Sequence, residues 1–238
     1  MVKDNLLIEL FTEELPPDSL EILSNQFGET IASELISRNL VSKSDFQTYA
    51  TPRRIAVNIK LVIDEAEDEE KLIKLMPYSV GFDINNKPTQ PLLKKISSID
   101  EAINTDDLEI KEDKGQKFIY VTKKLKGLKL ENGLNDIIKN SLQKLAIKKV
   151  MSYQLKDGWT SVNFARPMRG LIVLHGRQVL NASVLGCTSS NTTLGHRFES
   201  KKETITIKHA DDYEKTLETD GNVIACFNNR KTKIKKDI

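Results

Sequence analysis

Arginines beside turn-forming residues are the groups in this chain whose type and spacing suggest chemistry. The cationic side chains at such positions are Arg53, Arg54, Arg166, Arg169, His196 and Arg197. The residues expected to set their turns are Pro52, Pro167 and Gly195. A guanidinium group offers a rigid fork of hydrogen-bond donors that matches carboxylate or phosphate oxygens, whereas the lysine ammonium acts as a point charge. These six residues are therefore candidates for contact with phosphate or RNA.

An alternative is that the arginines pair with carboxylates inside the protein. Glu9, Glu13 and Glu14 lie in the same N-terminal stretch as Arg53 and Arg54, and an arginine fork pairs readily with a carboxylate. Both hypotheses stay open at this point. They differ in whether the arginines face solvent together.

The pair Glu13-Glu14 is not predicted to act as a catalytic carboxylate pair. Adjacent residues on a strand point to opposite faces, so the two carboxylates cannot converge on one substrate atom. Pro16 follows them and can open a helix. We expect both carboxylates near that helix entry, where negative charge meets the positive end of the helix dipole.

The polar stretch 191–198 is predicted to form a loop that presents binding groups. Gly195 is expected to take a positive φ in a tight turn, which glycine does without steric cost. That turn would present His196 and Arg197, while Phe198 is expected to pack inward as an anchor. The alternative is that the polar residues satisfy only the turn's own backbone and that Arg197 pairs with an acid.

The sequence lacks the motifs of other common chemistries. Neither GxxxxGK[ST] nor GxGxxG occurs, so the common backbone cradles for phosphate are missing. No nucleophile, base and acid set can be assigned. The spacing of the conceivable metal ligands matches no paired-ligand pattern; these are Cys187, His196 and Cys226. We predict no catalytic residue and no metal site in this chain.

Composition is compatible with an ordinary globular protein of the cytoplasm. The chain has 238 residues, of which 39% are hydrophobic, so it can bury a core. Its 36 Lys and Arg nearly balance 34 Asp and Glu, so only a local patch can favour a polyanionic partner. No apolar run approaches the roughly 18 residues of a membrane span, and two cysteines suit a reducing compartment.

The pattern of apolar residues predicts an α+β fold. Residues 1–63 are expected to form a β-α-β-β unit, with strands over 5–11, 45–50 and 54–63. Between the first two strands, a long amphipathic helix over 18–39 is expected to cover one sheet face, because apolar residues recur there every three or four positions. Asp18 and Glu21 have the spacing of a capping box at its start.

The rest of the chain is expected to continue with less regular structure. Residues 64–106 read as an acidic and irregular connection. Residues 107–238 read as a β-rich region with helices, beginning with a hairpin over 108–124 whose turn is Lys114-Gly115. A helix capped by Asn132 follows, and strands over 171–174, 179–185 and 204–208 precede a short helix over 210–217.

Several separated motifs resemble one known family. They occur in the family's order and are residues 6–10 (LLIEL), 12–16 (TEELP), 50–57 (ATPRRIAV), 164–169 (FARPMR), 191–198 (NTTLGHRF) and 212–214 (DYE). Together they resemble the N-terminal portion of the β subunit of bacterial glycyl-tRNA synthetase. Family β subunits continue into a His-Asp domain and an anticodon-binding domain, and we expect this sequence to stop before both.

The resemblance implies a subunit of a two-α, two-β enzyme that charges tRNA with glycine. In that family the α subunit holds the site that uses ATP and Mg, and the β subunit chiefly supplies tRNA binding. The implied partners are the α subunit, a second β subunit and the glycine tRNA, with no cofactor in this chain and no membrane contact. The alternative is a purely structural assembly module, or an inactive fragment, without tRNA contacts of its own.

Overall fold

The computed structural model describes residues 2–99, 103–113 and 115–238. The chain forms two compact units: residues up to 66 together with 128–238, and residues 67–127. This division differs from the expected one, which placed a boundary at residue 107. The reason is that β4 (Glu69–Pro77) pairs with β6 (Gln116–Leu125), so main-chain hydrogen bonds join the two halves of the smaller unit.

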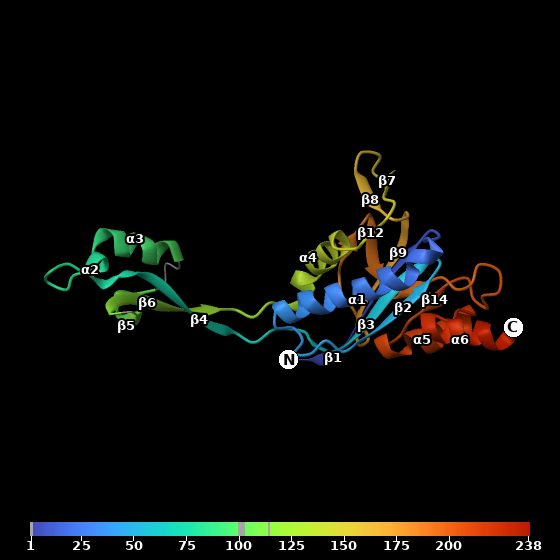
Figure 1. The fold of residues 1–238 in the computed structure, drawn as a ribbon, viewed down its shortest axis with the longest axis horizontal. Helices are drawn as coiled ribbons and strands as arrows, with labels where there is room; N and C mark the ends of the chain where they lie inside the picture. Colours follow the sequence, from blue (N-terminus) through green and yellow to red (C-terminus); the bar gives the residue numbers. More distant parts are fainter. Residues whose placement is uncertain (1, 100–102, 114) are drawn as a thin grey trace. The chain divides into compact units, whose positions relative to one another are not determined.

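A mixed sheet forms the centre of the larger unit (Figure 1), with strand order β11-β12-β9-β1-β3-β2. Its central strand β1 (Lys3–Thr12) pairs antiparallel with β3 (Arg54–Ile63) and with β9 (Met168–His175). The remaining strands of this sheet are β2 (Phe46–Thr51), β10 (Gln178–Val179), β11 (Ser183–Val184) and β12 (Cys187–Ser190). The strands predicted over 5–11, 45–50, 54–63 and 171–174 are confirmed, whereas 179–185 holds two short strands with a break between them.

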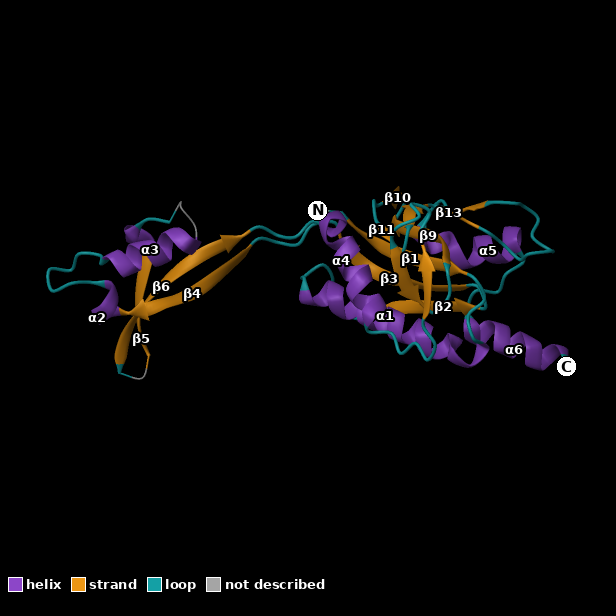
Figure 2. Ribbon diagram, turned by 90° about the horizontal axis from the view of Figure 1, so that it is seen from above, coloured by secondary structure: helices purple, strands orange, loops and turns teal. Residues whose placement is uncertain are grey.

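Both faces of this sheet are covered. Leu6, Ile8 and Leu10 belong to one buried apolar cluster and Leu7 to another, because successive side chains of a strand point to opposite faces. Figure 2 shows α1 (Leu20–Ser37) and α5 (Tyr213–Gly221) on opposite sides of the sheet. This two-sided burial explains why the β1 sequence is a nearly continuous apolar run.

The helix α1 confirms the long amphipathic helix predicted over 18–39. Its apolar stripe is buried and consists of Leu20, Leu23, Phe27, Ile31 and Leu35, and α4 (Leu130–Gln143) packs beside it. The predicted capping box is wrong, because a 3-10 turn (Pro17–Ser19) precedes the helix and moves the N-cap to Ser19. Asp18 instead accepts a hydrogen bond from Lys148 Nζ at 2.8 Å. In α4 the N-cap is Lys129, three residues before the predicted Asn132.

The opposite face of the sheet is covered by the C-terminal elements. They are β13 (Thr192–Thr193), β14 (Ile205–Thr206), a 3-10 turn (Ala210–Asp212) and α5. The last helix, α6 (Phe227–Asp237), instead starts beside the edge strand β2, and its Phe227 packs against the cluster on the α1 side. Tyr213 and Leu217 of α5 are fully buried against β1 and β9 residues. The short helix predicted over 210–217 is thus confirmed in place and extends to Gly221.

A hairpin that the sequence analysis did not predict follows α4. It consists of β7 (Met151–Gln154) and β8 (Ser161–Phe164). Asp157 and Gly158 make its turn, where Gly158 has a φ of +78°, and Asp157 accepts the main-chain N–H groups of Trp159 and Thr160. The Trp159 side chain is 90% exposed.

The smaller unit is a three-stranded sheet with helices. Its strand order is β4-β6-β5, with β5 spanning Leu108–Asp113, and its helices are α2 (Tyr78–Gly81) and α3 (Gln90–Ile99), with a further 3-10 turn (Thr105–Asp107). The hairpin predicted over 108–124 is confirmed; of its predicted turn, Lys114 lies outside the described residues, and Gly115 has a φ of +80°.

The expectation that residues 64–106 are irregular is wrong over much of their length. Leu92 and Ile96 of α3, one helical turn apart, are buried against Leu75, Ile119 and Val121 of the sheet. The helix was missed because a proline stands at its second position. There, the missing main-chain N–H costs no intrahelical hydrogen bond.

Candidate functional site

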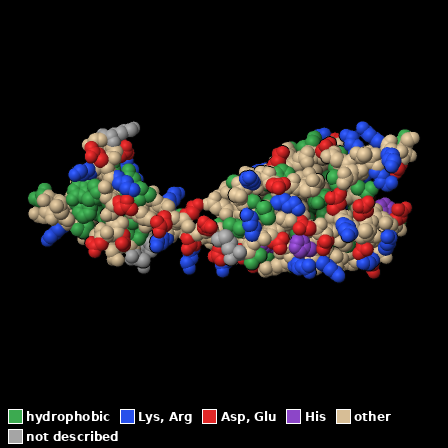
Figure 3. All heavy atoms as spheres, turned by 90° about the horizontal axis from the view of Figure 1, so that it is seen from below, with side chains coloured by type: hydrophobic (Ala, Val, Ile, Leu, Met, Phe, Trp, Pro, Cys, Tyr) green, Lys and Arg blue, Asp and Glu red, His purple; other side chains and the backbone are tan. Residues whose placement is uncertain are grey.

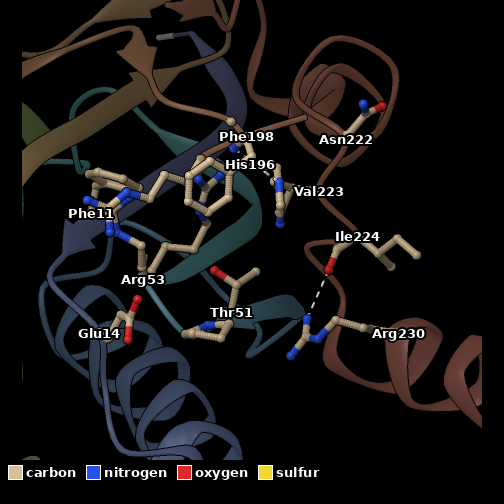
Figure 4. Close-up of a pocket in the computed structure, with 14 residues that line it drawn as sticks. Phe11, Glu14, Thr51, Arg53, His196, Phe198, Asn222, Val223, Ile224 and Arg230 are labelled. Carbon is tan, nitrogen blue, oxygen red and sulfur yellow. Dashed lines mark hydrogen bonds between the residues drawn. The ribbon is translucent and has the colours of Figure 1, made fainter. Parts of the chain in front are cut away.

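A pocket of about 340 Å³ lies in the larger unit at the end of β1, on the face that α5 covers. Its walls come from the β2–β3 turn, the loop 194–198, residues 222–224 and the start of α6. We call it the arginine pocket and define it by the lining residues Phe11, Arg53, Arg54, His196, Arg197, Phe198 and Arg230. Figure 4 shows Arg53, His196 and Phe198 on one side of it and Arg230 on the other.

Strand register explains why these groups meet. Phe11 of β1 lies directly opposite Arg54 of β3, and alternation puts Glu9 on the same face as Phe11. The guanidinium carbons of Arg53 and Arg54 lie 5.0 and 5.2 Å from the centre of the Phe11 ring, respectively. At such distances the face of an aromatic ring attracts a cation.

Arg54 is buried in an internal network. Its Nη1 lies 3.7 Å from Oε2 of Glu9, and its Nη2 donates a hydrogen bond to the carbonyl of Leu194. The hydroxyls of Tyr213 and Thr193 donate to the two carboxylate oxygens of Glu9. Burial, followed by the charge of Glu9, raises the pKa of Tyr213, so this hydroxyl stays a donor. Arg54 thus has the internal pairing that the sequence offered as the alternative, with Glu9 as the partner.

Part of the Arg54 side chain is left without a hydrogen bond. Its Nε and Nη1 are buried and have no hydrogen-bond partner among the residues that the structure describes. A buried donor without a partner costs free energy. Arg54 also lines the arginine pocket, although these two nitrogens are themselves buried.

Glu13 links the pocket to a second arginine. Arg169 Nε donates to Glu13 Oε1 at 2.6 Å, and Arg53 Nη2 lies 3.9 Å from Oε2. The hydrogen bond from Arg169, together with the charges of Arg169, Arg53 and Arg197, holds the pKa of Glu13 below its usual value. The carboxylate therefore faces arginines, which corrects the expectation that it stabilises the helix entry. Glu14 is exposed and lines the pocket.

The loop 194–198 differs from its prediction in two respects. Gly195 does not have a positive φ; it is needed because a Cβ there would lie 2.6 Å from the Cα of Gly221. His196 N donates to the Gly221 carbonyl at 2.7 Å, and its Nδ1 accepts from Glu199 N at 3.2 Å. Phe198 does not pack inward and is 85% exposed, because main-chain bonds hold the loop without an aromatic anchor.

The six predicted cationic residues do not face solvent together. Arg53, Arg54, His196 and Arg197 line the arginine pocket, and Arg169 joins them through Glu13. Arg166 is separate: it lines another pocket, beside Asp18 and Lys148, and its Nη1 donates to the carbonyl of Ala165 at 2.7 Å. Arg54 is buried, Arg53 is 26% exposed and Arg169 is 60% exposed.

Three further residues of the pocket were missed by sequence reasoning. Phe11 ends an apolar strand, Asn222 follows α5 with a φ of +50°, and Arg230 lies within a lysine-rich run. Arg230 Nη1 donates to the Ile224 carbonyl at 2.9 Å, and burial lowers the pKa of its guanidinium. The sequence did carry one signal for Arg230. It is an arginine among lysines, and only arginine has a planar fork of hydrogen-bond donors.

Comparison with known proteins decides the family. The family model described as "Glycyl-tRNA synthetase beta subunit" matches residues 6–238. The chain belongs to this family. This family is the one that the sequence motifs resemble, and the fold is of the predicted α+β class.

Individual relatives of the glycyl-tRNA synthetase β-subunit family give the same result. The glycine–tRNA ligase beta subunit of Nitrosomonas europaea is 40% identical over 240 residues, covering 100% of this chain and 34% of that protein. The glycine–tRNA ligase beta subunit of Acidovorax sp. (strain JS42) is 41% identical over 241 residues, with the same coverage. The chain therefore spans about a third of the length of the curated relatives it matches.

Two further observations apply to this member of the family. Within residues 2–99, 103–113 and 115–238, no three His, Cys, Asp or Glu side chains are grouped so that they could hold a metal ion. Over the same described residues, no helix has the length and apolar character to cross a membrane.

Proposed function

We propose that this chain is the non-catalytic region of a glycine–tRNA ligase β subunit that binds tRNA and associates with the α subunit. In this proposal the α subunit carries the site that uses ATP and Mg, a second β subunit completes the enzyme, and the enzyme acts in the cytoplasm. The main support for this proposal is that four basic residues lie together at the end of β1: Arg53, Arg169, His196 and Arg197.

The charge balance around Glu13 supports phosphate contact. Its carboxylate is shared by Arg169 and Arg53 and is influenced by Arg197, so one negative charge faces three positive ones. Exposed ion pairs contribute little to stability, and a phosphate can compete for the same guanidinium donors. Elsewhere the charges are mixed. On the face of the larger unit that Figure 3 shows, basic and acidic side chains are interspersed.

The alternative, a purely structural module, is favoured by one specific observation. The Arg54 side chain is buried and paired with Glu9, so it cannot contact RNA. That network includes the Leu194 carbonyl, so it supports the loop that carries His196 and Arg197. In the proposed function Arg54 therefore positions the loop, and the exposed arginines make the contacts.

The salt dependence of tRNA binding tests this proposal. In the assembled ligase, Arg197→Ala and Arg169→Ala should each weaken tRNA binding and lower the slope of log affinity against log salt by about one phosphate contact. Arg177→Ala is the matched control, because this exposed arginine lies beyond the opposite end of β9 and should leave the slope unchanged. Wild-type slopes in both test variants, with normal assembly, would favour the structural module.

A further inference from the structure

Phe198 is placed unusually for a large aromatic residue. Its side chain is 85% exposed in a loop at the arginine pocket, although a phenylalanine of a folded chain usually buries its ring. The Arg197 guanidinium carbon lies 5.8 Å from the ring centre, and the His196 ring lies 6.3 Å away in an edge-on arrangement. An aromatic face is thus presented to solvent beside cationic groups.

The loop that presents Phe198 is held by contacts at several points. The close approach of Gly195 to Gly221 and the bond from His196 N to the Gly221 carbonyl attach it to the end of α5. The Asn222 side-chain amide donates to the carbonyl of Glu199, just beyond the ring. The main chain that carries the exposed ring is therefore held in place before binding, which reduces the conformational entropy lost when the ring contacts a ligand.

The inner part of the pocket has a complementary chemistry. Phe11 provides an apolar surface beside the guanidinium groups of Arg53 and Arg54. Arg230 adds a further guanidinium on the other side (Figure 4). The pocket therefore combines aromatic surfaces with four lining arginines against one lining carboxylate, Glu14. This excess of positive charge beside aromatic rings suits a flat ring attached to an anion.

The size of the pocket limits what can enter. About 340 Å³ is at the lower end of the range for small-molecule sites, and a nucleic-acid duplex cannot enter such a volume. Single nucleotides of RNA loops and ends are splayed out and stack on aromatic side chains or arginine planes. A nucleotide has both features that the pocket matches, a planar base and a phosphate.

We infer that the arginine pocket holds one unstacked nucleotide of the bound RNA, with its base stacked on Phe198 and its phosphate facing Arg53 and Arg197. This inference rests on the proposed tRNA binding and specifies how one site of it works. Phe198 is a binding residue in this account, and Arg54 positions the loop that holds it.

Substitutions at Phe198 test the inference in the assembled ligase. Phe198→Ala should weaken tRNA binding about 5- to 100-fold, the range expected when one stacked base loses its aromatic partner. The salt slope should stay at the wild-type value, because no phosphate contact is removed. Phe198→Tyr should bind tRNA with wild-type affinity. Phe198→Leu, which is apolar but has no aromatic ring to stack, should bind as weakly as Phe198→Ala. Because the side chain is exposed, none of these changes should alter folding.

Trp159→Ala provides the control for losing an exposed aromatic group, since Trp159 is 90% exposed on the β7–β8 hairpin and does not line the pocket. Its tRNA affinity should equal that of the wild type. Three results would overturn the inference: Phe198→Ala binding tRNA like Trp159→Ala, Phe198→Leu binding like the wild type, or Phe198→Ala impairing assembly with protein subunits in place of tRNA binding. In each case the Arg197→Ala and Arg169→Ala salt slopes would still report separately on the proposed tRNA contact.

Photo-crosslinking gives an independent measurement. With p-benzoylphenylalanine in place of Phe198, the assembled ligase should crosslink to a single nucleotide position of tRNA. Excess unlabelled tRNA should abolish the product. Crosslinks spread over many positions would contradict a pocket for one nucleotide, and crosslinks only to protein would contradict RNA as the occupant.

Discussion

At the residue scale, two adjacent arginines have different roles because of the direction in which each points. Arg54 lies on β3 opposite Phe11 and extends into the buried network of Glu9, Tyr213 and Thr193. Arg53, the residue before it, is partly exposed and faces the shared carboxylate of Glu13. Arg53 lies in the β2–β3 turn and Arg54 is the first residue of β3, so the end of the turn separates a structural arginine from one that can meet a ligand.

The Glu9–Arg54 pair should contribute strongly to the stability of the fold. Both side chains are almost fully buried, at 1% and 2% exposed, and removing one partner leaves a buried charge uncompensated. Glu9→Gln and Arg54→Met should each lower the free energy of unfolding by about 3–5 kcal/mol. The double variant should lose clearly less than the sum, as urea unfolding in a double-mutant cycle would show. Strict additivity would mean that the two groups do not interact.

At the scale of elements, α1 and α4 are joined by a carboxylate as well as by their apolar faces. Glu34 of α1 accepts from Lys144 Nζ at 2.6 Å and from Asn140 Nδ2 at 3.3 Å, and Arg38, the C-cap residue of α1, pairs with it. The hydrogen bonds from Lys144 and Arg38 lower the pKa of Glu34 from 4.5 to about 2. This carboxylate therefore stays ionised in the folded chain at any ordinary pH.

That pKa shift predicts a pH-dependent stability. Because the folded state lowers the pKa, the contribution of Glu34 is complete above about pH 4.5 and is lost as the pH falls toward about 2. Glu34→Gln should lower the free energy of unfolding at pH 7 by about 1 kcal/mol, since solvent screens a half-exposed lysine partner. Thermal unfolding at pH 7 and at pH 2.5 would show a smaller difference in acid. Glu29→Gln, an exposed change on the same helix, should have no effect, and an equal loss in both variants would contradict this account.

The sequence predicts an element well where the pattern of apolar residues within that element is enough to define it. The apolar run of β1 and the helical stripe of α1 are local, so their positions were predicted closely. The contact of Glu13 with Arg169 joins residues 156 positions apart and requires the pairing of β1 with β9, which no local pattern specifies. Phe198 was predicted to be buried from its residue type alone, and only its main-chain surroundings show why its ring is exposed.

At the scale of the whole molecule, the residues that hold the arginine pocket in place differ from those that are accessible to a ligand. One sheet, covered on both faces, positions the end of β1, the β2–β3 turn and the loop 194–198. The buried Glu9 network fastens that loop to the sheet through the Leu194 carbonyl. The remaining cationic groups stay accessible at the arginine pocket and around Glu13. The proposed function rests on this division: the exposed arginines contact RNA, and the buried network holds the loop that carries them.

The most direct test of that claim compares two activities of the assembled ligase carrying Arg53→Ala, Arg169→Ala and Arg197→Ala together. Loss of tRNA contacts should raise the KM for tRNA in glycylation at least tenfold. Glycine-dependent exchange of pyrophosphate into ATP, measured without tRNA, should stay within about twofold of the wild type because the three residues take no part in it. An unchanged KM for tRNA, or an exchange rate that falls together with glycylation, would contradict the account.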